Sequence, residues 1–111
     1  MLRASSRAIG QPVDAVTVVQ GESDAIPFAR ELVAFVDATI DRDLVAAASA
    51  REALASAGGG AALVDAAAVL ANFEMMTRVA DGTGARQAPE RLATLGDERA
   101  RLGLDDYDSA R

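Results

Sequence analysis

Residues 63–84, which read LVDAAAVLANFEMMTRVADGTG, decide the fold class of this chain. At about 100° per residue, the apolar side chains of the first half of this stretch cover most of the circumference of a helix. In the second half, polar side chains gather on one side and apolar side chains hold the other. The stretch therefore predicts one long helix that ends in a polar tail and glycines.

A helix that is apolar all round has to be covered all round, which a domain of three or four helices can hardly do for one of its own members. Half of the 111 residues are hydrophobic, but many of them are alanines, so the core of a single chain would be thin. We therefore expect another subunit to supply part of the cover. The residues predicted at this interface are Leu63, Ala66, Ala67, Leu70 and Phe73.

Polar side chains of the same helix have a functional and a structural interpretation. Glu74, Arg78 and Asp81 share one side of the helix and fit either a weak acid–base or ligand cluster or a solvated helix end. We favour the helix end, with Glu74 and Arg78 as an ion pair worth a few tenths of a kcal/mol. Asp65 and Asn72 lie on the apolar stripe and need hydrogen-bond partners if they are buried. The candidates for lining a pocket are Asn72, Arg78 and Asp81.

An amphipathic helix is predicted upstream, over about residues 26–40. Ser23 or Asp24 is expected to be its N-cap, and Pro27 lies in the first turn, where its missing N–H costs least. Helical spacing brings five apolar side chains to one face. They are Phe28, Leu32, Phe35, Val36 and Ile40.

The middle of the chain predicts a short helix and a sharp stop. Ser49 and Glu52 match a capping box, so we expect a helix from there to Ala57, preceded by a helical turn or a loop at residues 44–48. The glycines at residues 58–60 are expected to end it as a left-handed cap. A phosphate-binding loop is the weaker interpretation, because no strand precedes these glycines and no Lys or Ser/Thr follows at the required place.

The outer parts of the chain complete an all-α prediction, a small helical bundle of about four helices that oligomerisation completes. Residues 15–19 are interpreted as a turn of helix or an irregular lead-in. Pro89 opens a short helix to about Leu95, residues 97–102 continue it or form a turn, and Tyr107 packs the acidic tail. The expected organisation is an irregular or flexible lead (1–22), a helical domain (23–107) and a tail (108–111).

Composition argues against several classes of partner. The net charge is −6, and the 11 basic residues, all Arg, are scattered among carboxylates, so nucleic acid is not expected. The start of the chain has no apolar signal-peptide region, and no segment reaches about 18 uninterrupted apolar residues. We therefore predict a cytoplasmic protein without a membrane partner. The Arg, Ala, Gly, Val and Asp usage indicates a GC-rich bacterial genome.

Composition also limits the chemistry. The sequence contains no Cys and no His, which excludes Ser–His–Asp and Cys–His nucleophile schemes. Met75 and Met76 are expected to fill the core, because soft-metal sites need Cys or His beside them. The acidic groups at residues 41–43 and 105–108 are interpreted as solvated charge flanking helices, not as calcium loops. We predict no catalytic residue, no cofactor and no metal.

The text of residues 68–84, AVLANFEMMTRVADGTG, resembles the last long helix of the alkylhydroperoxidase D-like, or carboxymuconolactone decarboxylase-like, proteins. The matching positions are Asn72, Phe73, Arg78, Ala80, Asp81 and Gly84, whereas Thr77 stands where that family has Asn. Residues 28–35 resemble the family helix before a Thr- or Ser-capped turn, and residues 49–58 resemble that capped helix. Residues 101–107 resemble the tail of peroxidase-related members.

The resemblance implies the C-terminal half of such a domain. Residues 1–9 resemble the stretch just after the family's catalytic helix. The peroxidase members carry a Cys-x-x-Cys with a nearby His and Glu on that upstream helix, and the decarboxylases rely on a His. This chain has neither residue type, so no catalytic residue carries over.

Two functions follow as hypotheses. The first is a non-catalytic or partial domain of this family, a pseudoenzyme that acts mainly as an oligomerisation scaffold. The second is a subunit of a peroxidase or decarboxylase whose Cys/His helix comes from another chain or from an upstream segment. The expected partner is a second copy of the chain or a Cys/His-bearing half.

Overall fold

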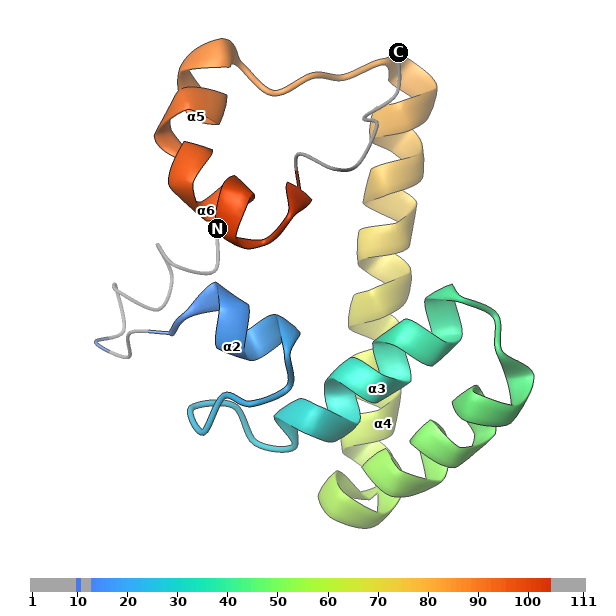
Figure 1. The fold of residues 1–111 in the computed structure, drawn as a ribbon. Coiled ribbons are helices and arrows are strands. Elements are labelled where there is room, and N and C mark those ends of the chain that lie inside the picture. Colours follow the sequence, from blue (N-terminus) through green and yellow to red (C-terminus); the bar gives the residue numbers. More distant parts are fainter. Residues whose placement is uncertain (1–9, 11–12, 105–111) are drawn as a thin grey trace. The chain divides into compact units, whose positions relative to one another are not determined.

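The computed structural model of the chain describes residue 10 and residues 13–104. The fold is all-α as predicted: the chain is mostly helical, and the described residues include no strand. The helices are α2 (Ala15–Val19), α3 (Ala29–Ile40), α4 (Leu44–Thr83), α5 (Pro89–Thr94) and α6 (Gly96–Arg101), shown in Figure 1. The chain divides into two compact units, Met1–Leu70 and Ala71–Arg111, and α4 contributes to both.

The first unit has a small core built from α3 and α4. Leu54 is fully buried and Phe35 nearly so, and the rest of the buried cluster is alanine: Ala38, Ala47 and Ala50. Alanine has no side chain beyond Cβ, so its use here lets the helix backbones approach closely but buries little apolar area. Five partly buried side chains pack against the cluster, namely Leu32, Val36, Leu63, Ala66 and Leu70. Of the predicted apolar face of α3, Phe28 and Ile40 are exposed.

The start of α3 differs from the prediction of Ser23 or Asp24 as N-cap. The helix begins at Ala29, and Phe28 occupies the N-cap position in the left-handed region, with φ 58° and ψ 30°. The carbonyl oxygen of Phe28 accepts the first helical hydrogen bond, from the Leu32 N–H at 2.9 Å. The N-cap prediction is wrong because it relied on a side-chain cap, and no side-chain hydrogen bond caps this helix.

The start of α4 also differs from the prediction of a capping box at Ser49. The helix begins at Leu44, because the Asp43 carboxylate accepts from the backbone N–H groups of Val45 and Ala46, both at 3.0 Å. These are N–H groups that the first turn of a helix leaves without a helical partner. Ser49 therefore lies inside the helix, and residues 44–48 are its first turns.

Gly59 bends α4 within the first unit. Its φ of 83° and ψ of 168° are non-helical, so segments 44–58 and 60–83 meet at an angle there (Figure 1). The predicted stop at the three glycines is confirmed, but the left-handed cap is wrong, because this ψ is extended. Such backbone angles belong essentially to glycine. The second segment resumes directly after Gly59.

The second unit contains the end of α4, α5 and α6. The predicted end of the long helix is confirmed: Gly84 has φ 67°, and the Ala85 N–H donates back to the Ala80 carbonyl at 3.0 Å. This geometry is typical of a glycine-terminated helix. Pro89 opens α5 at its first position as predicted, and α6 replaces the turn or continuation expected at residues 97–102.

Several expectations concern residues at the two ends of the chain. Residues 15–19 form the short helix α2, in agreement with the helical interpretation. The resemblance assigned to residues 1–9, the acidic group at 105–108 and the packing of Tyr107 lie outside the described residues.

Candidate interaction surface

The inner side of the second α4 segment has cover from the same chain. Leu63, Ala66 and Leu70 fall three and four residues apart, on one face of the helix, and pack against the buried cluster of the first unit. Ala67 and Phe73 are exposed. The five residues predicted to form one subunit interface therefore divide: three are partly covered by this chain, and two face solvent.

Away from Leu63, Leu70 and the polar side chains, half of the circumference of the segment is apolar and exposed. Its large side chains each expose between 52% and 66% of their surface. They are Val64, Val69, Phe73, Met75, Met76 and Val79, and we call this set the outer face. Single exposed apolar residues are ordinary, but a contiguous group along one helix marks an interaction surface.

Two of these side chains lie where the sequence did not predict them. Met75 and Met76 were predicted to fill the core, but both are more than half exposed. The prediction is wrong because the buried cluster draws its residues from α3 and from α4 up to Leu70 only. Methionine is flexible and polarisable, and it is common on surfaces that adapt to a partner.

The polar residues Asp65 and Asn72 lie within the outer face. Both are exposed, and their spacing of seven residues is close to two helical turns. The Asn72 amide nitrogen donates to the Met76 sulfur at 3.7 Å. A thioether is a weak acceptor, so this bond leaves most of the hydrogen-bonding capacity of the amide to solvent or to a partner.

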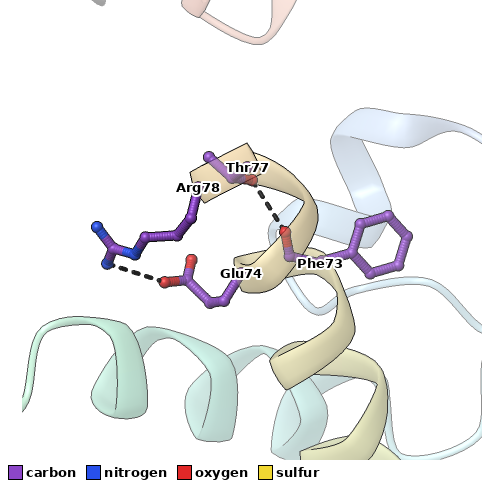
Figure 2. A network of polar contacts seen from close by, with 4 residues as sticks. All are labelled: Phe73, Glu74, Thr77 and Arg78. Atoms are coloured by element: carbon purple, nitrogen blue, oxygen red, sulfur yellow. Dashed lines mark hydrogen bonds and ion pairs between the residues drawn. The ribbon is translucent and has the colours of Figure 1, made fainter. Parts of the chain in front are cut away.

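A polar cluster occupies another side of the same helix. Arg78 Nη2 lies 3.4 Å from Glu74 Oε2, and the Thr77 hydroxyl donates to the Phe73 carbonyl at 3.0 Å. Figure 2 shows the Phe73 ring pointing away from the Glu74–Arg78 pair. The side chains of Arg78 and Glu74 are 73% and 44% exposed, so the predicted ion pair is confirmed as a surface pair of small energetic weight.

The three candidate pocket residues do not converge on α4. Asn72 and Asp81 are nine residues apart, so on a helix of 100° per residue they face opposite sides. Arg78 lies on the Asp81 side and pairs with Glu74. All three are exposed, and this helix alone does not assemble them into a site.

One acidic side chain in the described part of the chain has a clear role in local structure. Asp43, one of the residues considered for calcium, caps α4. Among the described residues, no group of three His, Cys, Asp or Glu side chains lies close enough to hold a metal ion. The surface that remains to be explained is the outer face.

Comparison of the chain with protein-family models, with curated proteins and with solved structures found no match. By length and composition alone, α4 is one helix in the described part of the chain that is long and apolar enough to cross a membrane. Only 6% of its most apolar stretch is buried.

Proposed function

We propose that this chain is a helical oligomerisation module, a small bundle that association with another subunit completes. The outer face of α4 carries the proposal, because six large apolar side chains of one helix are more than half exposed there. Burying apolar surface yields about 25 cal/mol per Å² and is the main favourable term in most protein association. A partner that covers this face removes it from water.

The finer part of the proposal concerns ancestry. The resemblance of residues 68–84 to the last long helix of the alkylhydroperoxidase D-like proteins supports a half-domain of that kind, of about four helices. The absence of Cys and His supports a non-catalytic role, a pseudoenzyme of cytoplasmic, bacterial origin. Thr77 departs from the family pattern, and Ser49 does not cap a helix as the resembled turn would require.

Light scattering of the full chain at micromolar concentration tests the proposal. We expect a dimer or higher oligomer for the natural chain and a shift to monomer for Met76→Lys, because the ammonium group would have to be buried in the interface. Thr77→Lys is the matched control: the neighbouring residue is exposed on the polar side and should leave the oligomer intact. A monodisperse natural monomer would contradict the proposal.

The alternative is a subunit that completes a Cys/His-bearing partner. A peroxide-reduction assay separates the two functions. Oligomers of this chain that stay inactive support the scaffold, whereas activity that appears only on mixing with a thiol-bearing chain supports the alternative.

A further inference from the structure

We propose that a second copy of this chain packs antiparallel on α4, with Asn72 of one copy facing Asn72 of the other. The inference rests on the proposed oligomerisation and adds its partner, its contact residues and its orientation. The contact residues, which we call the seam, are Asp65, Val69, Asn72, Met76 and Val79. All five are exposed and lie on the continuous helical segment 60–83.

The spacing of the seam is that of helix-to-helix packing. Its residues follow one another at intervals of four, three, four and three, the pattern with which two α-helices interlock side by side. Phe73 and Met75 flank the seam on its two sides and widen it. Leu63, Ala66 and Leu70 lie on another side of the helix, where they make the contact with the buried cluster.

The exposed apolar surface around the seam is large enough for an interface with a second copy. At on the order of 100 Å² of exposed surface for each of the five large apolar side chains in and beside the seam, two copies offer roughly 1,000 Å², about the least that a specific interface needs. A single copy cannot use this area on its own α4. A two-fold contact uses the same face twice and closes the assembly.

The polar residues of the seam favour a second copy over a lipid bilayer. An Asn amide carries both donors and an acceptor, so two facing copies of Asn72 satisfy each other, and one such residue in a helix seam specifies register. In hydrocarbon, Asn72 and the Asp65 carboxylate would have no such partner, and an acidic group within a membrane helix is costly.

Charge decides the orientation. In a parallel pair, Asp65 of one copy would face Asp65 of the other, and two carboxylates side by side repel. In an antiparallel pair centred on Asn72, each Asp65 faces Val79 near an end of the contact, where the carboxylate reaches solvent. Asn72 also lies at the middle of residues 60–83, so the antiparallel pair overlaps along the whole segment.

Disulfide trapping tests this arrangement, because the chain has no cysteine of its own. The variants are Asp65→Cys, Val79→Cys and the double variant, each in the full chain. In the antiparallel pair, the thiol introduced at position 65 of one copy meets the thiol introduced at position 79 of the other. The two copies of position 65 are about 21 Å apart along the helix axis. A disulfide needs Cα atoms within about 7 Å, so neither single variant should cross-link.

We expect mild oxidation to convert most of the double variant into a covalent dimer on a non-reducing gel. Asp65→Cys with Thr77→Cys is the matched control, since residue 77 lies off the seam, and it should remain monomeric on the gel. Circular dichroism checks that every variant keeps the helical content of the natural chain.

Other outcomes separate the inference from the proposed function. Cross-linking of the single variants, or a dimer in light scattering that the double variant does not trap, overturns the antiparallel register and leaves oligomerisation standing. A monomer in light scattering overturns both. Co-sedimentation of that monomer with vesicles of anionic phospholipid assigns the outer face to a membrane and also overturns both.

Discussion

The ring of Phe28 lies directly against Gly58, which links the start of α3 to the end of the first α4 segment. A Cβ at position 58 would come within 2.9 Å of the Phe28 ring and 2.8 Å of the Ala62 Cβ. Phe28 itself holds a left-handed backbone, which costs a non-glycine residue on the order of 1 kcal/mol. The glycine therefore provides the space that the ring occupies, and the pair explains why the sequence places a glycine before the bend.

Gly58→Ala should lower the free energy of unfolding by about 1–3 kcal/mol, the usual cost of forcing an extra methyl group into a filled site. Gly60→Ala is the control, because a Cβ there meets nothing within 4 Å, and it should be neutral or raise stability by about 0.4–1 kcal/mol. Urea unfolding followed by circular dichroism measures both. Equal effects of the two substitutions would refute the close Phe28–Gly58 contact.

Leu54→Ala should be among the most destabilising changes in the chain. Leu54 is fully buried in a cluster otherwise made of Phe35 and alanines, so its removal leaves a cavity that small neighbours cannot fill. The expected loss is about 2–5 kcal/mol, seen as a lower midpoint of urea unfolding. Leu44→Ala, at a side chain 82% exposed, should change stability by less than about 0.5 kcal/mol. Similar losses at both positions would argue against the described core.

Asp43→Ala should cost about 1 kcal/mol, because it removes the acceptor for the Val45 and Ala46 N–H groups. Asp43→Asn should retain most of the stability, since the amide oxygen accepts the same bonds. Ser49→Ala distinguishes the two possible helix starts: it should be neutral or slightly stabilising inside a helix. Urea unfolding of the three variants measures these differences. A loss at Ser49 comparable with the loss at Asp43 would restore the capping box.

Asn72→Asp should weaken self-association at least tenfold at neutral pH. The substitution would place two carboxylates, one from each copy, opposite each other across the proposed seam, where they repel. Thr77→Asp places the same charge on the polar side of α4 and should leave the association constant unchanged. Sedimentation equilibrium at several concentrations measures both. Salt should partly rescue the Asn72 variant, since ions screen the repulsion. An unchanged Asn72→Asp oligomer would exclude this residue from the interface.

Arg78→Ala should change the free energy of unfolding by only a few tenths of a kcal/mol, because its pair with Glu74 is solvent-exposed. Thermal unfolding of this variant beside Glu74→Ala and the double variant measures the coupling directly. A coupling above about 1 kcal/mol would mean that the pair has a buried neighbour, such as a partner subunit.

The local features of this fold were predictable because their causes lie within a few residues along the chain. Pro89 begins α5 and Gly84 ends α4 through the backbone angles that these residue types permit. The break at residues 58–60 and the Glu74–Arg78 pair follow in the same way. Helical periodicity was sufficient to establish an all-α chain.

The choice among competing local signals was not predictable. Asp43 and Ser49 are both suitable caps, and the chain uses Asp43, which follows the end of α3 at Ile40 and the turn in the backbone at Arg42, with φ 57°. Phe28 is the N-cap of α3, and its ring lies against Gly58, which is thirty residues away in the sequence. Each outcome depends on a contact between segments.

The sequence by itself determined that the first half of the helix over residues 63–84 would be apolar on most of its surface, because side-chain identity and the helical period are enough to place each residue on a face. Only the tertiary structure decided which face is covered. Leu63, Ala66 and Leu70 pack on the core, while Met75 and Met76 stay exposed. Burial is a property of residues distant in sequence that meet in space, so a pattern along one helix shows what needs cover but not what supplies it.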